Sequence, residues 1–566
     1  MEEKFNQIKQ TGATFTPKEL ANYLAKKLIT FQSCDNLKIL DPACGDGALL
    51  LAISSILNER NTKFALYGYD TNQGYINTAE KKLSFNNHVN LRTADFLDTI
   101  DLATEQLSLF NSKSEALNNF ADLIIANPPY VRTQTLGAIK AQLIAKKFGL
   151  KGRVDLYYPF LIAMTHALKE DGILGVITSN RYLFTKSGAS IRQFLTENYE
   201  ILEVIDLGDT KLFDAAVLPA IFIGRKKVKT TTPNSLVRFI KIYEELNGYT
   251  GKVTAKKSIF QILNTKKNGY FSVDSKKYKK TSGTLKFGNT KEHIWSMLSK
   301  EEMLWVAQIE NNSTSQIKDH FKVRVGIKTT ADKVFISDNW DKLNGTKPED
   351  ELLKDLISQE NIKSWKICHS KKLKVLYPHF SEDGKKQTID LKNYPKAKTY
   401  FLNHQEKLKS RKYLINSGRN WFEIWVPQNP SYWQLPKLVF PDISKTPRFY
   451  YDNSGKIVNG NCYWIAAEKE NDKELLLLIQ GIANSKLMTK YHDLVFNNKL
   501  YSGRRRYFSQ YVESYPLPNI YSKESIEIIQ VVKKIHTTNQ QIDSLLVQLE
   551  NAVANAYKTQ PIYTLD

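Results

Sequence analysis

The chain has 566 residues, more than one hydrophobic core supports, so we expect at least two domains. Hydrophobic residues make up 42% of the chain and charged residues 24%, which excludes a disordered protein. Residues 246–566 hold 51 Lys and Arg against 32 Asp and Glu and carry nearly all of the net charge of +22, which predicts a polyanionic partner.

Several classes of protein are excluded by simple patterns. Four cysteines (Cys34, Cys44, Cys368 and Cys462) lie far apart without CxxC spacing, which argues against a zinc site and fits a reducing compartment. The polar N-terminus is not a signal peptide, and no apolar run approaches the roughly 18 residues of a membrane helix. We therefore expect a cytoplasmic protein with no bound metal and no membrane contact.

Residues 1–245 alternate between short apolar runs and helical patterns. Seven runs are expected to be strands: Lys38–Asp41, Ala65–Asp70, Asn90–Thr93, Ala121–Ala126, Gly172–Thr178, Glu203–Asp206 and Ala220–Gly224. Helical periodicity lies between most of them, at Pro17–Leu28, Gly47–Asn58, Ile76–Phe85 and Tyr157–Leu168. This alternation predicts a mostly parallel sheet covered on both faces, with ligands at the carboxyl ends of its strands.

A glycine-containing turn, Asp41-Pro42-Ala43-Cys44-Gly45-Asp46-Gly47, follows the first predicted strand. Gly45 and Gly47 lack a Cβ where backbone must pass close to a ligand. A nicotinamide enzyme would normally show the longer GxGxxG turn, which is missing here. The turn therefore favours a different nucleotide-like cofactor.

Two further strand ends carry acidic residues. The second predicted strand ends at Asp70, whose carboxylate can accept hydrogen bonds from ribose hydroxyls. The third leads to Asp95 and Phe96, which could bind an adenine amine and pack on its ring. Together with Asp41, acidic residues thus lie at the ends of three successive predicted strands. Such an arrangement is hard to obtain by chance.

The fourth predicted strand runs directly into Asn127-Pro128-Pro129-Tyr130. Two prolines stop the strand and stiffen the turn. The Asn127 side-chain oxygen and the Pro128 carbonyl can bind the two hydrogens of a planar amine, which frees its lone pair to attack an electrophile held in line. This chemistry needs no metal and no covalent intermediate, so Cys44 has no nucleophilic role. Tyr130 can stack on a base flipped out of a duplex.

The turn Asp41–Gly47 resembles the D/E-x-x-x-G-x-G motif of class I S-adenosylmethionine-dependent methyltransferases. Thr14–Pro17 resembles the amino-terminal motif of adenine methyltransferases, which contacts the methionine moiety. Thr16 is also expected to cap the first helix, with Pro17 at its first position. The resemblance implies S-adenosylmethionine as cofactor. The residues that it implies as ligands are Thr16, Asp41, Ala43, Gly45, Gly47, Asp70, Asp95 and Phe96.

The motif order is similar to that of the gamma-class adenine methyltransferases, which include TaqI-like and Eco57I-like enzymes. The similarity continues through Asp155–Phe160, Gly172–Thr178 and Leu212–Ile221. It implies that Phe213 and Tyr130 sandwich the flipped base, although Phe213 could equally be a core residue. Asp214 departs from the family, which often has Pro there. Asn rather than Ser at the first position of the tetrapeptide favours adenine over cytosine.

The second half resembles the specificity domain of the same enzymes at residues 317–336 and 475–492 and, less clearly, at 433–437. Basic residues interleaved with aromatic ones suit phosphate and base contacts. The candidate DNA-binding residues are Lys328, Lys333, Arg411, Lys412, Arg419, Arg504, Arg505 and Arg506. Apolar positions from Ile528 to Ala556 in steps of four and three predict a helix whose seam packs within the chain or against another subunit.

We therefore expect an α/β chain of four parts. Residues 1–245 form a Rossmann-like class I methyltransferase domain and residues 246–300 a connecting region. Residues 301–520 form a mixed α+β target-recognition domain, and residues 521–566 a terminal helix.

The expected function is site-specific transfer of methyl from S-adenosylmethionine to the N6 amine of adenine in double-stranded DNA, as the modification component of a restriction–modification system. RNA and release-factor glutamine methyltransferases share the tetrapeptide, so an RNA or protein nitrogen methyltransferase is an alternative, as is a solitary DNA methyltransferase. A non-catalytic subunit is disfavoured by the intact tetrapeptide and glycine turn. No segment resembles a nuclease, so any cognate restriction endonuclease is expected to be encoded separately.

Overall fold

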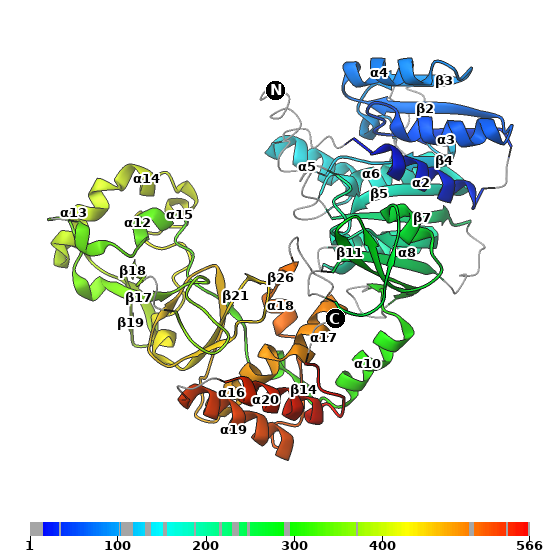
Figure 1. Cartoon of the computed structure of the whole chain (residues 1–566). Helices are drawn as coiled ribbons and strands as arrows, with labels where there is room; N and C mark the ends of the chain where they lie inside the picture. The colour runs from blue at the N-terminus through cyan, green and yellow to red at the C-terminus, as the bar shows by residue number, and fades with distance from the viewer. Residues whose placement is uncertain are drawn as a thin grey trace. The chain divides into compact units, whose positions relative to one another are not determined.

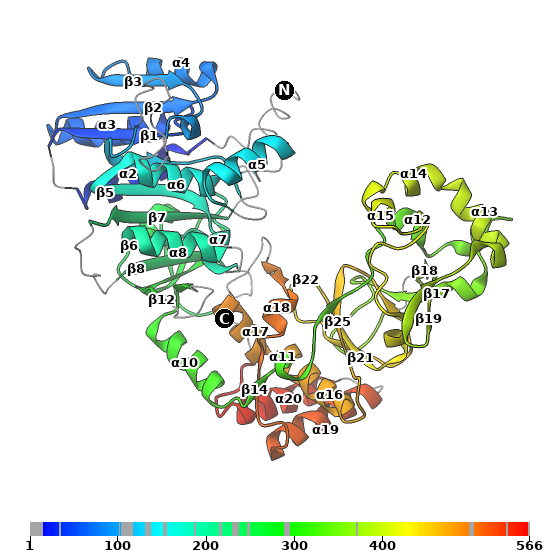
Figure 2. The same ribbon diagram turned by 180° about the vertical axis from the view of Figure 1, so that it is seen from behind.

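The computed structural model describes residues 15–32, 35–100, 102, 117–130, 137–150, 155–185, 188–213, 218–228, 237–245, 249–287, 295–343, 345–368, 372–496, 503–538 and 542–563. The chain divides into two compact units, Met1–Glu301 and Glu302–Asp566 (Figures 1 and 2). Within these ranges, no helix is long and apolar enough to span a bilayer.

An eleven-stranded sheet forms the centre of the first unit, in the order β3-β2-β1-β4-β5-β7-β6-β8-β11-β10-β9. The strands are β1 (Leu37–Asp41), β2 (Phe64–Asp70), β3 (Val89–Thr93), β4 (Ala121–Ala126), β5 (Leu168–Ser179), β6 (Tyr199–Asp206), β7 (Pro219–Lys226), β8 (Arg238–Glu244), β9 (Val253–Ala255), β10 (Gly269–Val273) and β11 (Lys276–Thr284). Strands β3, β2, β1, β4 and β5 run parallel, whereas β7 is antiparallel to both of its neighbours. All seven predicted strands are confirmed, and the parallel core agrees with the expected Rossmann-like domain.

Helices cover both faces of this sheet (Figures 1 and 2). Along β4, Ile124 and Ala126 belong to one core cluster and Leu123 and Ile125 to the other, because successive side chains of a strand point to opposite faces. The cluster that contains Leu123 includes residues of α2 (Lys18–Ile29), α3 (Ala48–Glu59), α4 (Gln73–Leu83) and α9 (Ile259–Asn264). The cluster that contains Ile124 includes residues of α5 (Ala138–Lys147), α6 (Tyr157–Ala167), α7 (Arg181–Phe184) and α8 (Ala189–Asn198).

The expected connecting region, 246–300, is not a linker. Strands β9, β10 and β11 extend the same sheet, and β11 pairs antiparallel with β8 from Tyr278 opposite Glu244 to Thr284 opposite Arg238. Strand β11 is not predicted because its sequence is polar. Lys280 is nevertheless buried, and its ammonium donates to the Thr265 carbonyl at 2.7 Å. The first compact unit therefore extends to Glu301 and does not end at residue 245.

The second unit is mixed α+β, as expected. One four-stranded sheet comprises β15 (Arg324–Val325), β25 (Cys462–Ala466), β21 (Lys437–Pro441) and β23 (Tyr450–Asp452). Another comprises β16 (Ile336–Ser337), β18 (Lys374–Leu376), β17 (Leu353–Ile357) and β24 (Ile457–Val458). Short ribbons pair β19 (His379–Glu382) with β20 (Lys385–Thr388) and β22 (Ile443–Ser444) with β26 (Arg505–Arg506). Its helices include α12 (Asp332–Phe335), α13 (Pro395–Asn403), α14 (Gln405–Lys409), α15 (Lys412–Asn416), α16 (Asp472–Asn484) and α17 (Lys486–Phe496).

The single terminal helix predicted for 521–566 is instead two helices, α19 (Lys523–Thr537) and α20 (Asp543–Ala556). Both pack on each other and on α16. A Cβ on Gly481 of α16 would lie 2.6 Å from Ile528 of α19 and 3.3 Å from Leu549 of α20, so the three helices approach closely. The apolar seam thus packs within the chain. Asn539, a polar residue that occupies one position of the predicted seam, lies outside the described residues.

Gly326, directly after β15, allows two backbone segments of the second unit to meet. A Cβ there would lie 2.1 Å from the Asn459 carbonyl oxygen and 2.5 Å from that of Val458. Backbone atoms cannot move aside as a side-chain end can, so Gly326→Ala is expected to destabilise the protein by about 1–3 kcal/mol or more. Thermal unfolding would measure this, with Gly74→Ala as control, because only the Asn72 side chain lies near that position. Equal unfolding midpoints for both variants would contradict the expectation.

Candidate active site

Polar residues gather at one edge of the first unit's sheet. Because β1, β2, β3 and β4 are parallel, their carboxyl ends meet there, and they are followed or ended by Asp41, Asp70, Asp95 and Asn127. A cavity at this edge brings together three segments of sequence. It is lined by Phe15, Thr16, Asp41, Ala43, Cys44, Gly45, Asp46, Ala48, Leu49 and Asn127.

The glycine turn is fastened to the neighbouring strand. The Gly45 N–H donates to the Asp70 carboxylate at 3.0 Å, and the Cys44 N–H donates to the Tyr69 carbonyl at 2.8 Å. Gly47 has φ of 81°, in the left-handed region, and a Cβ there would lie 3.0 Å from the Cβ of Ala79. The turn therefore needs glycine for both backbone conformation and space, and Asp70 helps to hold its shape.

Asp41 is fully buried at the floor of this cavity. One carboxylate oxygen accepts from the Ala43 N–H at 3.1 Å, whereas the other has no hydrogen-bond partner within the described part of the chain. Burial, with the nearby charges of Asp70 and Asp46, raises the pKa of Asp41 to about 8. A buried carboxylate oxygen without a donor is costly, so the cavity suits a cationic or hydrogen-bond-donating ligand.

The Asn127 side chain is held from both ends. Its amide nitrogen donates to the Thr16 hydroxyl at 2.9 Å, and the Tyr130 hydroxyl donates to its amide oxygen. Burial raises the pKa of Tyr130 well above its ordinary value, so the phenol stays a neutral donor. These two contacts fix which way the amide points.

The predicted helix cap at Thr16 is wrong. Helix α2 begins at Lys18, its N-cap is Pro17, and no side chain caps it. The Thr16 hydroxyl is instead engaged with Asn127, 111 positions away. Thr16 therefore joins the amino-terminal segment to the Asn127–Tyr130 turn.

Tyr130 and Phe213 lie side by side but do not form an open sandwich. Their ring centroids are 6.3 Å apart and their planes are inclined by 70°, an edge-on contact. Phe213 is 7% exposed and belongs to the core cluster of the first unit. The rings must separate or rotate before a base can stack between them. Asp214, where the sequence departs from the family, lies outside the described residues.

Asp95 and Phe96, which follow β3 after Ala94, both have partners within the first unit. Phe96 is only 1% exposed and packs against Phe160 and Tyr69 at centroid distances of 6.1 and 5.9 Å, so its ring belongs to the hydrophobic core. Asp95 accepts from the Leu97 N–H at 3.2 Å and lies 3.4 Å from the Lys140 ammonium. Lys140 on α5 was missed, because nothing in the sequence links positions 45 residues apart.

Three of the predicted DNA-binding arginines are structural. Arg411 is 5% exposed and donates to the carbonyls of residues 329, 408, 421 and 423. Arg419 donates to the Glu423 carboxylate and to two carbonyls, and Arg505 forms a two-pronged ion pair with Asp493. Their guanidinium groups are engaged by carbonyls and carboxylates inside the second unit, so in this structure they are not presented for phosphate contacts as the sequence predicts.

The remaining candidates lie at the surface of the second unit. Lys328, Lys333, Lys412 and Arg504 are exposed. Arg506 is partly exposed, 3.5 Å from the Asp442 carboxylate and over the Phe508 ring. These five side chains remain predicted DNA contacts.

Two family models match the chain: the Eco57I restriction-modification methylase over residues 56–213 and the TaqI-like C-terminal specificity domain over residues 360–517. The chain is 46% identical over 571 residues to the type II methyltransferase M.BanIII of Aneurinibacillus aneurinilyticus, with 98% of this chain and 97% of that relative covered. It is 26% identical to the type II methyltransferase M.BstVI of Geobacillus stearothermophilus, with 94% and 93% covered. The similarity to M.BanIII therefore extends over both units.

Solved structures resemble the chain more distantly. The type IIG restriction endonuclease BpuSI aligns with 96% of this chain and 65% of its own at 14% identity and a TM-score of 0.40. A type I restriction-modification methyltransferase subunit of Streptococcus thermophilus aligns with 40% of this chain and 47% of its own at 22% identity and a TM-score of 0.32. The fold assignment rests on the strand order and burial described above.

Proposed function

Because the chain belongs to the type II DNA methyltransferases of restriction–modification systems, we propose that it methylates the N6 amine of adenine in duplex DNA with S-adenosylmethionine as donor. The observation that carries this proposal is Asn127, held between Thr16 and Tyr130 beside the cavity of the glycine turn. Residues 1–301 would be the catalytic part and residues 302–566 the target-recognition part.

The cavity fits this cofactor at its cationic end. The unpartnered oxygen of Asp41 would accept from the α-ammonium, and the carboxylate of Asp70, on the next strand, would face the ribose hydroxyls. Gly45, Gly47 and Ala43 would leave room for the ligand beside the backbone, and Thr16 would border the methionine end. When bound, the cofactor supplies an electrophilic methyl group on a sulfonium.

The residues of the chain would prepare the amine. The Asn127 amide oxygen would accept one hydrogen of the adenine N6 amine, and the Pro128 carbonyl would accept the other. The Tyr130 hydroxyl donates to that same amide oxygen. When the base binds, this hydroxyl must therefore share the oxygen with the N6 amine or break its hydrogen bond. Rotation of the Tyr130 ring away from its edge-on contact with Phe213 would open the stacking position.

The test is incubation of the purified chain with labelled S-adenosylmethionine and duplex DNA, RNA or protein, followed by nucleoside analysis. We expect label in N6-methyladenine of duplex DNA. Label in cytosine would refute the adenine assignment, and label in RNA or protein alone would refute the DNA substrate. Long-read sequencing of DNA from cells that express the chain would then give the recognition sequence. Restriction of unmethylated DNA in the source cells would reveal a cognate endonuclease, which we propose is a separate protein.

Cofactor affinity is expected to depend on pH through Asp41. Its raised pKa of about 8 leaves the carboxyl mostly neutral at about pH 6, so its attraction for an ammonium grows as pH rises toward 8. If only the ionised form binds tightly, affinity rises by up to about tenfold per pH unit. Isothermal titration between about pH 6 and 7.5, below the range where the ligand's own amine titrates, would measure this slope.

Asp41→Asn should weaken binding and flatten the slope. Asp171→Asn, which changes an exposed carboxylate outside the cavity that pairs with Arg225, should keep the slope and serves as the matched control. An unchanged slope in Asp41→Asn would contradict the assignment of Asp41 to the ammonium.

We also propose that the chain acts in the cytoplasm. Cys44 and Cys462 are buried thiols without a disulfide partner, which fits a reducing compartment. Burial and the nearby carboxylates of Asp41 and Asp70 raise the pKa of Cys44, so its thiol stays protonated and does not act as a nucleophile.

A further inference from the structure

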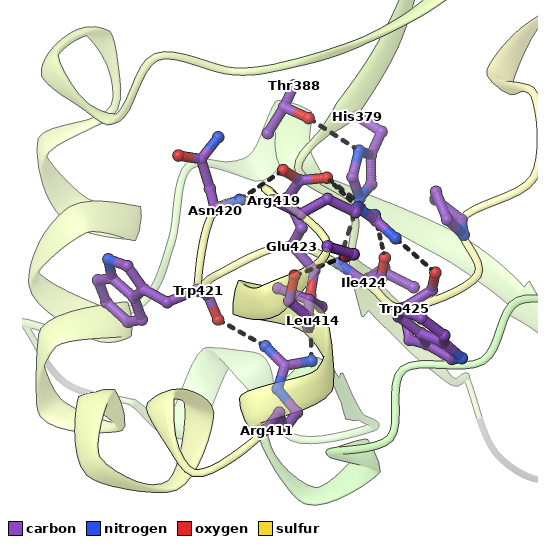
Figure 3. A network of polar contacts seen from close by, with 12 residues as sticks. His379, Thr388, Arg411, Leu414, Arg419, Asn420, Trp421, Glu423, Ile424 and Trp425 are labelled. Atoms are coloured by element: carbon purple, nitrogen blue, oxygen red, sulfur yellow. Dashed lines mark hydrogen bonds and ion pairs between the residues drawn. The ribbon is translucent and has the colours of Figure 1, made fainter.

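An irregular loop of the second unit, residues 417–429 between α15 and the 3-10 helix Pro430–Gln434, is fixed by an unusual number of main-chain contacts (Figure 3). Arg411 lies directly before α15. Its guanidinium donates to two carbonyls of the loop, that of Trp421 at 2.6 Å and that of Glu423 at 3.0 Å. The same guanidinium donates to the Thr329 carbonyl at 2.9 Å, which ties the loop to the segment before α12.

A second arginine fixes the middle of the loop. Arg419 grips the Glu423 carboxylate at 2.8 and 3.0 Å and donates to the carbonyls of Ile424 and Trp425 at 2.6 and 2.7 Å (Figure 3). The Ile424 N–H donates to the Nε2 atom of His379 at 3.2 Å, and burial keeps that ring neutral by lowering the pKa of His379 to about 3.

The far end of the loop is anchored to neighbouring backbone. Val426 and Lys328 exchange both main-chain hydrogen bonds, at 2.9 and 3.0 Å, and the Tyr377 hydroxyl donates to the Pro427 carbonyl at 2.6 Å. A loop without regular secondary structure that is bound at residues 421, 423, 424, 425, 426 and 427 has little conformational freedom left to lose on binding a partner.

This fixed loop and its neighbours present large aromatic side chains with lysines around them. Tyr413 is 46% exposed and meets the partly exposed Trp425 edge-on at a centroid distance of 4.9 Å. The Lys409 ammonium lies 5.8 Å from the ring of Trp421. Lys412, next to Tyr413, and Lys328, paired with the residue after Trp425, are both exposed. We define the residues Lys328, Lys409, Lys412, Tyr413, Trp421 and Trp425 as the aromatic-lysine surface.

Within the part of the chain that the structure describes, the lysines of this surface form no close ion pairs, although the charge of Lys328 acts on the Asp442 carboxyl and opposes the rise in its pKa that burial causes. Throughout the described ranges, no carboxylate forms an ion pair with Lys328, Lys409 or Lys412. Exposed ammonium groups next to partly exposed aromatic rings match a polyanion that also offers flat, apolar faces. Nucleic acid has that chemistry, and an acidic protein lacks the flat faces.

We propose that the aromatic-lysine surface contacts the target DNA: the three lysines bind phosphates, and the Tyr413–Trp425 pair lies against bases or sugars in a groove. Arg411 and Arg419 are positioning residues that hold the loop and do not touch DNA. This proposal rests on the proposed function, because it names the part of the second unit that engages the DNA substrate.

The test compares binding of the full chain to a duplex that carries its methylated site and to a scrambled duplex, at several salt concentrations. Lys412→Ala and Lys328→Ala should each weaken binding to both duplexes alike and lower the slope of log affinity against log salt by about one. Trp425→Ala should weaken binding to the methylated site at least tenfold and leave the salt slope unchanged. Trp425→Phe covers the case in which the alanine variant does not fold.

Arg419→Lys separates a positioning role from a phosphate contact, because it keeps the charge and loses the fork that grips Glu423 and the carbonyls. A positioning role predicts binding as weak as that of Trp425→Ala, with an unchanged salt slope and faster proteolysis within residues 417–429. A direct phosphate contact predicts nearly normal binding and a normal protease pattern. Tyr521→Ala and Lys523→Ala, at exposed positions outside the surface, are the matched controls.

Two failures can be told apart. If the wild-type chain methylates duplex DNA and the Lys412, Lys328 and Trp425 variants bind it as the wild type does, the aromatic-lysine surface is overturned and the proposed function stands. If the wild-type chain modifies no duplex DNA, the proposed function is overturned and the role of this surface with it.

Discussion

Replacing Asn127 with alanine is expected to lower the rate of methyl transfer to duplex DNA by roughly 100- to 1,000-fold, the usual cost of removing a fixed polar group that acts on the reacting atoms. The amide oxygen is the acceptor that the structure orients, with Thr16 on its nitrogen and Tyr130 on its oxygen. Because Asn127 lines only one side of the cavity of the glycine turn, cofactor affinity should change little. Single-turnover methylation and cofactor titration on the same variant would measure both quantities.

Thr16 supplies a graded control for this result. Thr16→Val removes the hydroxyl that accepts from the Asn127 amide nitrogen, which lets the amide turn over, so an intermediate loss of rate of about tenfold is expected. Thr16→Ser keeps the hydroxyl and should restore most of the rate. Wild-type rates in Asn127→Ala would remove Asn127 from the mechanism. A Thr16→Ser variant as slow as Thr16→Val would show that Thr16 acts through packing and not through its hydroxyl.

Replacing Asp452 with alanine should strongly destabilise the second unit. Lys437 and Asp452 are both fully buried and lie 2.9 Å apart, and the Lys437 ammonium also donates to the Trp433 carbonyl at 2.7 Å. Removing one partner of a buried pair leaves the other charge uncompensated, at a cost of about 3–5 kcal/mol in the free energy of unfolding. Thermal or urea-induced unfolding would detect this, and the double variant Lys437→Met with Asp452→Leu should recover much of the stability.

The pH dependence of the Asp452→Ala variant gives a second test. Burial lowers the pKa of Lys437, so the folded variant holds fewer protons than the unfolded chain at pH values between the folded and the unfolded pKa of this group, and its stability should rise as pH increases through that window. Asp341→Ala is the matched control, since it breaks a pair with Lys347 in which the Asp341 side chain is 91% exposed, and its unfolding midpoint should stay at the wild-type value. If both variants unfold alike, the buried pair does not stabilise the fold.

The sequence predicted the central sheet and its acidic edge because those signals are local. Apolar runs of strand length, the glycines of the turn and the Asn127–Tyr130 tetrapeptide each lie within a few neighbouring residues. Parallel pairing then brings Asp41, Asp70 and Asn127 to one edge whatever the intervening lengths. The strand β11 escaped prediction because its buried Lys280 looks like a surface residue until its carbonyl partner is known.

The errors concern partners that are distant in sequence. Arg411 and Arg505 lie in basic segments of the sequence, which predicts phosphate contacts. In the structure, Arg411 binds the carbonyl of Thr329 and Arg505 binds a carboxylate on α17. Phe96 is itself predicted from the sequence to pack on the cofactor's ring, and only the packing of Phe160 against it shows that it lies in the core. No pattern of spacing predicts the contact between Thr16 and Asn127, because it depends on where the chain enters the first helix.

The two arginines that hold the loop at 417–429 have a consequence for how this protein could acquire new target sequences. Arg411 and Arg419 hold the loop mainly through main-chain carbonyls, which every amino acid possesses, and through Glu423. The side chains at 413, 421 and 425 can therefore be exchanged without dismantling the backbone that carries them. A library randomised at those three positions, with Arg411, Arg419 and Glu423 kept, is the natural starting point for selecting enzymes of altered specificity.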